Sequence, residues 1–276
     1  MPIPTIIAFS PTLCANENIL LTGQGGGTYS WDGPLGYSSK QQSVTIPAYS
    51  SSYGGFYTLT VTDNNLCKNV VQQKITVYDL PTGYLSSDHL SGCVPFCSEL
   101  ILKQAPGATP LLDVNWLMGV FTFTGSTFSH CFNEPGNYKI YGTLSDTNNC
   151  RNTIFNSVDA YPLPIADFSF LPENPRELMD DVVFTNTSKG DQLSNWNWFF
   201  IENGGYQSTS QHTSYSFEKS GIYPVAMVVK NVWGCSDTVV KTIAVMDGFS
   251  VFVPNVFTPN QDGLNDVFFP VARGIL

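Results

Sequence analysis

Charge is the scarcest feature of this 276-residue sequence, because only 12% of its residues are Asp, Glu, Lys or Arg. Soluble domains contain about 25% of these residues. Its 12 basic residues are outnumbered by 22 acidic ones, which gives a net charge of −10, so no nucleic-acid-binding face is expected. The sequence also lacks an apolar run long enough to form a membrane-spanning helix. Aromatic residues make up 13% of the chain, which excludes a disordered chain.

Patterns typical of catalysis are absent as well. The three histidines, His89, His130 and His212, form no His-x-x-x-His pair, and no Gly-x-Ser-x-Gly motif is present. The glycine run 23–27 is not followed by Lys and Ser or Thr, as a phosphate-binding loop would be. We therefore predict that the protein is not an enzyme and needs no organic cofactor.

Seven cysteines in a chain with so little charge indicate an oxidising, extracellular compartment. The one close pair, Cys93 and Cys97, has no second pair with which to complete a zinc site. The N-terminus lacks the basic start and apolar core of a signal peptide. We therefore expect a fragment whose signal lies upstream, and the abrupt end at Leu276 suggests a second cut.

An internal repeat organises the chain. Five positions of the middle region recur 85 residues later without a gap, namely Phe132, Gly136, Tyr138, Asp146 and Cys150 as Phe217, Gly221, Tyr223, Asn231 and Cys235. The first region repeats the Gly-x-Tyr step at residues 55–57, with Asp63 four residues before Cys67. Each repeat also has a tryptophan upstream of that step: Trp31, Trp116, and Trp196 with Trp198.

Alternation of β-branched and aromatic residues with polar ones predicts strands throughout. The fold class we predict is all-β, with three tandem β-sandwiches at residues 1–79, 80–161 and 162–246. A fourth, truncated β segment follows at residues 247–276.

Cysteine positions predict disulfides within the first and second sandwiches. Cys14–Cys67 would close a loop of about 53 residues and stabilise the fold by about 4 kcal/mol, and Cys93–Cys150 occupies the equivalent places. Cys97–Cys131 would form a second bridge in the middle sandwich. Cys235 is then a free thiol, because the place of its partner falls near residues 176–178, where there is no cysteine. Two readings of Cys235 stay open: a small buried apolar residue or an intermolecular link.

The third sandwich resembles a PKD domain. The residues that carry this resemblance are Pro164–Phe168, Val183–Ser188, Trp196–Phe200, Gly221–Val225 and Gly234–Thr238. The second sandwich resembles the disulfide-bearing PKD variety of Bacteroidetes surface proteins through Gly92–Cys97 and His130–Tyr138, and the first is a looser Ig-like or PKD-like relative. The family's Trp-x-Phe-Gly-Asp-Gly turn is missing here, so no ligand role is carried over from that loop.

The stretch Val253–Phe268 resembles the opening of the gliding-motility-associated C-terminal domain, the type B sorting signal of type IX secretion. This resemblance implies a cargo exported across the outer membrane to the cell surface or released from it. It also implies the type IX translocon and associated outer-membrane proteins as partners.

Three ligand or modification sites are candidates. Oxygen ligands at Asn260, Asp262, Leu264 (carbonyl) and Asp266 fit Ca²⁺, although an Asx-rich turn explains the same residues. Trp196 and Trp233 are candidate sugar-stacking aromatics. Thr238, in Asp-Thr-Val, resembles an O-glycosylation site of Bacteroidetes.

The resulting hypothesis is a non-enzymatic extracellular stalk of a type IX secretion cargo, from a gliding-motility adhesin. It would space an upstream functional region from the sorting domain. The alternative is a carbohydrate-binding accessory module of a secreted polysaccharide-degrading enzyme, with surface glycans as its partner.

Overall fold

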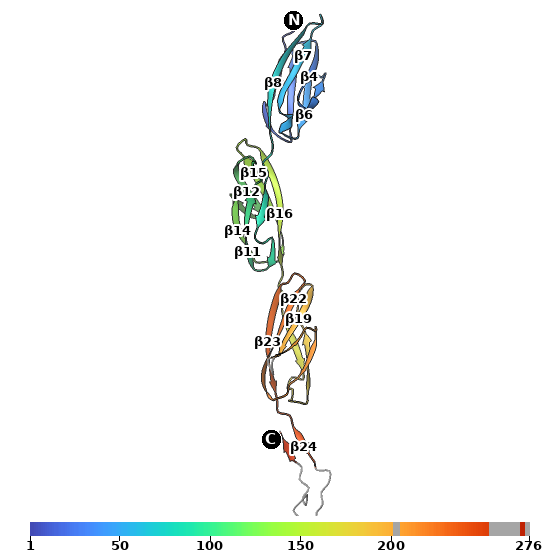
Figure 1. Ribbon diagram of the computed structural model, residues 1–276, viewed down its shortest axis with the longest axis vertical. Helices are drawn as coiled ribbons and strands as arrows, with labels where there is room; N and C mark the ends of the chain where they lie inside the picture. Colours follow the sequence, from blue (N-terminus) through green and yellow to red (C-terminus); the bar gives the residue numbers. More distant parts are fainter. Residues whose placement is uncertain (201–204, 254–270, 274–276) are drawn as a thin grey trace, which may run out of the picture. The chain divides into compact units, whose positions relative to one another are not determined.

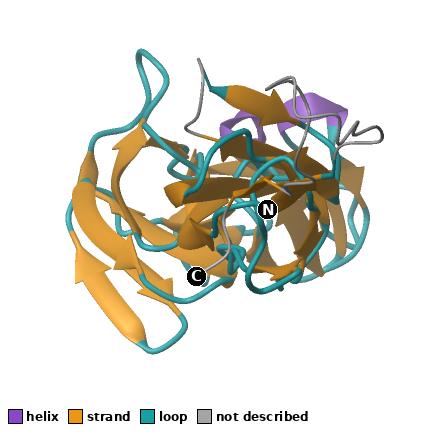
Figure 2. Ribbon diagram, turned by 90° about the horizontal axis from the view of Figure 1, so that it is seen from below, coloured by secondary structure: helices purple, strands orange, loops and turns teal. Residues whose placement is uncertain are grey.

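The computed structural model describes residues 1–200, 205–253 and 271–273 and consists of β-strands and loops (Figures 1 and 2). The helical turns in this described part are two short 3₁₀ turns, η1 (Pro34–Gly36) and η2 (Ser51–Tyr53). The prediction of an all-β fold is therefore confirmed. Within the same residues, no helix has the length and apolar character needed to cross a bilayer.

The first sandwich is built from eight strands in two sheets, of order β1-β3-β6 and β2-β8-β7-β4-β5. The strands are β1 (Thr5–Ala8), β2 (Thr12–Cys14), β3 (Glu17–Gln24), β4 (Thr28–Asp32), β5 (Ser38–Ser39), β6 (Ser43–Ala48), β7 (Gly55–Thr62) and β8 (Lys68–Tyr78). In β6 and β7, buried and solvent-facing residues alternate, because successive side chains of a strand point to opposite faces of the sheet.

The second sandwich repeats this strand order, with sheets β14-β11-β9 and β10-β16-β15-β12-β13. Its strands are β9 (Tyr84–Ser87), β10 (Ser91–Cys93), β11 (Phe96–Lys103), β12 (Leu111–Met118), β13 (Phe121–Thr124), β14 (Thr127–Phe132), β15 (Gly136–Asp146) and β16 (Arg151–Tyr161).

The third sandwich has sheets β17-β18-β21 and β20-β19-β22-β23. Its strands are β17 (Phe168–Leu171), β18 (Asp181–Asn186), β19 (Leu193–Phe200), β20 (Tyr206–Ser208), β21 (Thr213–Ser216), β22 (Gly221–Asn231) and β23 (Ser236–Val245). In place of a strand equivalent to β2 or β10 it has an isolated parallel bridge between Arg176 and Met246. A further pair, β24 (Ser250–Phe252) and β25 (Val271–Arg273), is antiparallel.

The predicted boundaries after residues 79, 161 and 246 lie within one residue of the ends of β8, β16 and β23. Residue contacts, in contrast, divide the chain into two compact units, and the division passes through the second sandwich. The first unit comprises Met1–Leu90, Cys97–Cys131 and Asn137–Asp159, and the second comprises Ser91–Phe96, Phe132–Gly136 and Ala160–Leu276. The three predicted domains are therefore three pairs of sheets, but they are not three separate contact units.

One tryptophan lies in the core of each sandwich. Trp31, Trp116 and Trp198 are at most 2% exposed. Each indole Nε1–H donates to a backbone carbonyl at 2.9 Å, with Gln41, Gly125 and Ser210 as the respective acceptors. Because a buried indole N–H needs a partner, these bonds fix how each ring lies between its two sheets.

The Gly-x-Tyr step of the repeat also has a structural role. The Tyr57 hydroxyl donates to the Tyr53 carbonyl, and the Tyr223 hydroxyl donates to the Lys219 carbonyl, both at 2.9 Å and both four residues upstream. This is the tyrosine corner of Ig-like sandwiches. Burial raises the pKa of the Tyr57 hydroxyl to about 12.

Candidate functional site

Two of the three disulfides in the described chain connect different sandwiches. Cys14 of the first sandwich bonds to Cys150 of the second, and Cys93 of the second bonds to Cys235 of the third. Both pairs have a Cα–Cα distance of 5.6 Å, within the usual range for a disulfide. The free cysteine of the described chain is Cys67, which is exposed.

Two of the predicted bridges and the predicted free thiol are therefore wrong. Cys14 does not pair with Cys67, Cys93 does not pair with Cys150, and Cys235 is not free. The third predicted bridge, Cys97–Cys131, is present and lies inside the second sandwich.

Strand direction explains the error in the first sandwich. Cys14 ends β2, which runs parallel to β8 and places Cys14 opposite Tyr78, at the end of β8. Cys67 comes directly before the start of that strand at Lys68. The eleven residues of β8 separate the two cysteines by about 36 Å, whereas a disulfide needs Cα atoms within about 7 Å.

The same geometry recurs at Cys93. The Val94 backbone N–H donates to the Tyr161 carbonyl at 3.0 Å, which places Cys93 beside the end of β16. Cys150 precedes the start of β16 at Arg151. The first and second sandwiches therefore each carry one cysteine at either end of their last long strand, and these two cysteines of one sandwich cannot bond to each other.

An Asx turn holds the cysteine that precedes the last long strand of each sandwich. The side-chain oxygen Oδ1 of Asp or Asn accepts a hydrogen bond from the cysteine N–H four residues later. These N···Oδ1 distances are 2.9, 2.9 and 3.0 Å for Cys67–Asp63, Cys150–Asp146 and Cys235–Asn231. The return bond, from the Asp or Asn N–H to the cysteine carbonyl, is 3.0 Å long in all three turns.

A ring stack accompanies the Cys93–Cys235 disulfide. Trp233 and Tyr161 are nearly parallel, with centroids 5.2 Å apart and an interplanar angle of 9°. One face of Trp233 is therefore covered, and the residue is 36% exposed.

The second candidate sugar-stacking aromatic, Trp196, lies on β19 and packs against the core of the third sandwich. Its indole Nε1 is buried and has no hydrogen-bond partner among the described residues. Trp196 and Trp233 are thus both held by internal packing, and the structure does not bring them together as one flat exposed platform.

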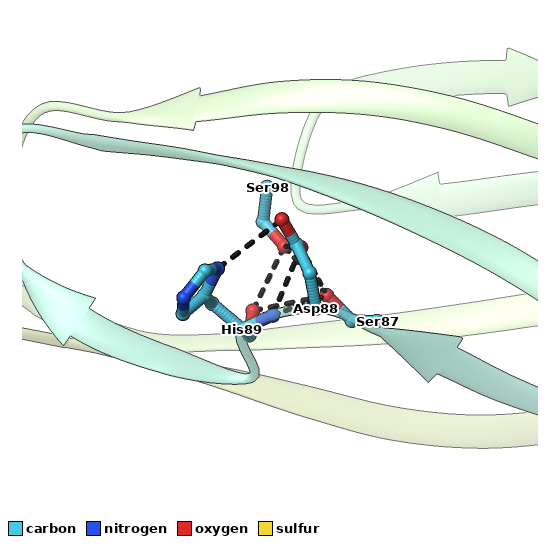
Figure 3. A network of polar contacts seen from close by, with 4 residues as sticks. All are labelled: Ser87, Asp88, His89 and Ser98. Atoms are coloured by element: carbon cyan, nitrogen blue, oxygen red, sulfur yellow. Dashed lines mark hydrogen bonds and ion pairs between the residues drawn. The ribbon is translucent and has the colours of Figure 1, made fainter.

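A polar network in the second sandwich contains Ser, His and Asp side chains, the residue types of a hydrolase triad (Figure 3). The Ser98 hydroxyl lies 2.9 Å from Asp88 Oδ1 and 2.6 Å from the Ser87 hydroxyl. The His89 Nδ1 lies 3.2 Å from Asp88 Oδ2. Since the carboxylate stands between the hydroxyl and the imidazole, this arrangement closes the turn between β9 and β10 and does not activate Ser98 as a nucleophile.

The hydrogen bonds of this network favour the charged form of Asp88. Those from Ser98, the largest contribution, and from His89 and Ser87 lower the pKa of the Asp88 carboxyl to about 2. At His130 the neutral form is favoured instead. Partial burial lowers the pKa of the His130 imidazole, because desolvation disfavours the charged imidazolium.

Two further candidates stay predictions. The calcium ligands Asn260, Asp262, Leu264 and Asp266 lie outside the described residues. Thr238 is exposed on β23, opposite Val228, which is compatible with O-glycosylation. Calorimetric titration of Ca²⁺ into the chain, with Asp262→Ala beside it, tests the first, and intact mass of the native protein tests the second.

Sequence reasoning missed which cysteines meet, although one signal was available. The third sandwich lacks a cysteine at the place of Cys14 and Cys93, and Arg176 stands there, since its bridge to Met246 matches the pairing of Cys14 with Tyr78. Two cysteines, Cys14 and Cys93, lie beside the end of a last long strand, and three, Cys67, Cys150 and Cys235, precede the start of one. These numbers fit pairing between neighbouring sandwiches as well as pairing within sandwiches.

No family model matches the chain, and no curated protein does. Among solved structures, it is similar to three N-terminal domains of the outer capsid protein Hoc of bacteriophage RB49, with 13% identity and a TM-score of 0.43 over 88% of this chain and 97% of that one. It is also similar to the ectodomain of mouse nectin-like molecule 4, with 10% identity and a TM-score of 0.41 over 86% and 96%. A bacterial ice-binding adhesin matches with 10% identity and a TM-score of 0.34 over 88% and 98%. The strand order and pairing of the chain itself show a series of β-sandwiches.

Proposed function

We propose that this chain is a non-enzymatic extracellular stalk that bears load between an upstream functional region and a C-terminal sorting domain. The observation that carries the proposal is the pair of disulfides between consecutive sandwiches, Cys14–Cys150 and Cys93–Cys235. A peptide linker alone lets neighbouring domains bend and separate. A second covalent connection at each joint restricts both motions.

The two disulfides also interleave along the chain. After unfolding, three segments, 15–92, 94–149 and 151–234, connect the same two cystines in parallel. A break in any one of these segments leaves the chain connected. This topology suits a segment that is stretched outside the cell, where proteases act.

Interleaving limits how far the oxidised chain can extend. The shortest covalent route runs from residue 1 to Cys14, from Cys150 back to Cys131, from Cys97 back to Cys93, and from Cys235 to residue 276. This route contains about 80 residues and spans about 280 Å when fully extended. The reduced chain of 276 residues would span about 970 Å.

Single-molecule stretching by the two ends tests this proposal. We expect a final contour length of about 280 Å under oxidising conditions and about 970 Å with reductant. The matched control is the double variant Cys14→Ser with Cys150→Ser, which keeps the second joint and should give about 470 Å. A length near 970 Å for the oxidised chain would show that the joints carry no load.

We further propose that the parent protein is a type IX secretion cargo on the surface of a Bacteroidetes cell, a gliding-motility adhesin. The support is the resemblance of residues 253–268 to the type B sorting domain, together with three disulfides suited to an oxidising compartment. Its partners are then the translocon and associated outer-membrane proteins. Labelling of intact cells with an antibody against residues 1–246 should be positive, and staining only after permeabilisation would contradict export.

A carbohydrate-binding module is the second candidate, favoured by the 36% exposure of Trp233. A glycan array separates it from the stalk, with Trp196→Ala and Trp233→Ala as the test variants. Specific binding that both substitutions abolish would support sugar recognition. The stalk proposal predicts no such binding, since Trp196 packs on the core and Trp233 stacks on Tyr161.

A further inference from the structure

Cys67 occupies a place where its two counterparts are disulfide-bonded. It precedes β8 as Cys150 precedes β16 and Cys235 precedes β23. Cys150 and Cys235 are buried, at 0% and 1% exposure, and bonded to a cysteine of the preceding sandwich. Cys67 is exposed and free. Since an exposed thiol contributes nothing to a core, packing does not account for it.

The backbone around Cys67 already has the geometry of the two bonded sites. Its N–H donates to Asp63 Oδ1 at 2.9 Å, and its carbonyl accepts from the Asp63 N–H at 3.0 Å. The residue before each of the three cysteines has a left-handed backbone, with φ of 63° at Leu66, 62° at Asn149 and 85° at Gly234. Leu66 adopts this conformation although it is a bulky residue, for which it is rare.

The segment that leads into the first sandwich accepts the same hydrogen bond as the linker between the first and second sandwiches. The Asn69 side-chain Nδ2 donates to the Pro2 carbonyl at 3.0 Å. In the second sandwich, Asn152, two residues after Cys150, donates in the same way to the Pro81 carbonyl at 2.9 Å. Pro81 belongs to the linker from the first sandwich, whose Cys14 bonds to Cys150. The Cys67 end of the first sandwich is therefore built like a joint that has a sandwich before it.

We propose that Cys67 is the attachment site for a preceding Ig-like sandwich, through a disulfide to the cysteine at the end of that sandwich's β2-like strand. The partner cysteine is of the kind represented here by Cys14 and Cys93. The third sandwich has Arg176 in that place, so it has no cysteine with which to form a disulfide of this kind to a following sandwich. The inference rests on the internal repeat of the joint and is independent of the stalk function.

The chemistry is the oxidation of two thiols. One sulfur–sulfur bond forms between Cys67 and the partner cysteine, and two protons and two electrons are released. A disulfide oxidant such as oxidised glutathione accepts them, and its own sulfur–sulfur bond breaks to give two thiols.

A tandem chain provides the test. Residues 1–80 are placed directly before Pro2 of the full chain, so that the junction of Leu80 with Pro2 reproduces that of Leu80 with Pro81. The chain is folded in a glutathione redox buffer, alkylated and digested without reductant. We expect a cross-linked peptide that joins Cys14 of the added copy to the original Cys67. The free thiol should move to Cys67 of the added copy, so one cysteine is alkylated.

Matched variants control the result. Cys14→Ser in the added copy, or Cys67→Ser in the original sandwich, should each abolish the cross-link and leave the three original disulfides in place. Those three disulfides show in the same digest that the chain has folded. The proposal is overturned if three cysteines are alkylated while the original disulfides form. A bridge between Cys14 and Cys67 of the added copy, or a dimer through two Cys67 residues, overturns it equally.

Discussion

Asp88 lies in the turn between β9 and β10, where hydrogen bonds set its protonation (Figure 3). Its pKa is lowered to about 2, chiefly by the Ser98 hydroxyl. Because the folded pKa lies below the ordinary value of about 3.9, the charged form stabilises the fold. This contribution is complete above about pH 4 and is lost as the pH falls towards 2.

We predict that an NMR titration of the Asp88 carboxyl has its midpoint near pH 2, and that Ser98→Ala raises this midpoint towards the ordinary value. A midpoint near pH 4 in the unsubstituted chain would contradict the network.

The burial of Trp198 allows the cost of its substitution to be estimated. It is fully buried and packs against Phe168 and Phe184, with centroid distances of 5.2 and 5.9 Å. We predict that Trp198→Ala destabilises the third sandwich by about 3–5 kcal/mol. Hydrogen exchange of β22 amides should then be faster by at least about 100-fold. The control Trp233→Ala, at a partly exposed site, should change this exchange much less, and equal effects would contradict the assigned core.

At the level of elements, the Asx turn before each last long strand explains why Asp or Asn stands four residues before cysteine. Asp146 is buried, and its Oδ1 accepts from the N–H groups of Asn148 and Cys150, both at 2.9 Å. Removing this acceptor leaves buried donors unsatisfied. We predict that Asp146→Ala costs about 1–3 kcal/mol and speeds exchange of the Cys150 amide about 10- to 100-fold.

Asp146→Asn is the matched control for that prediction. Asn231 holds the same turn in the third sandwich with a side-chain amide oxygen, at 3.0 Å from the Cys235 nitrogen. The Asn variant should therefore exchange at nearly the rate of the unsubstituted protein. If Asp146→Ala and Asp146→Asn behave alike, the hydrogen bond to the cysteine N–H is not what stabilises the turn.

Strands and turns could be predicted because they depend on local patterns. Alternation predicted strands in the regions that form β8, β16 and β23, and the repeat register placed an Asp or Asn four residues before the cysteine that precedes each of them. The same local spacing does not show at which end of a sandwich a cysteine lies. That depends on the parallel pairing of β2 with β8, which brings Cys14 to the end of β8 opposite Cys67.

For the whole molecule, the cysteines form a series in which each sandwich binds the next. Pairing within sandwiches would leave Cys235 free, and pairing between neighbours leaves Cys67 free. Seven cysteines allow both, so composition could not decide. The length of the last strand decides between the two pairings. Its eleven residues separate the two cysteine positions of one sandwich by about 36 Å, which is too far for a disulfide.

Disulfide mapping tests this account most directly. The oxidised native chain is alkylated, digested at acidic pH to prevent thiol exchange, and analysed by mass spectrometry without reductant. We predict peptides that link Cys14 to Cys150 and Cys93 to Cys235, with alkylation at Cys67. Peptides that link Cys14 to Cys67 and Cys93 to Cys150, with alkylation at Cys235, would contradict it.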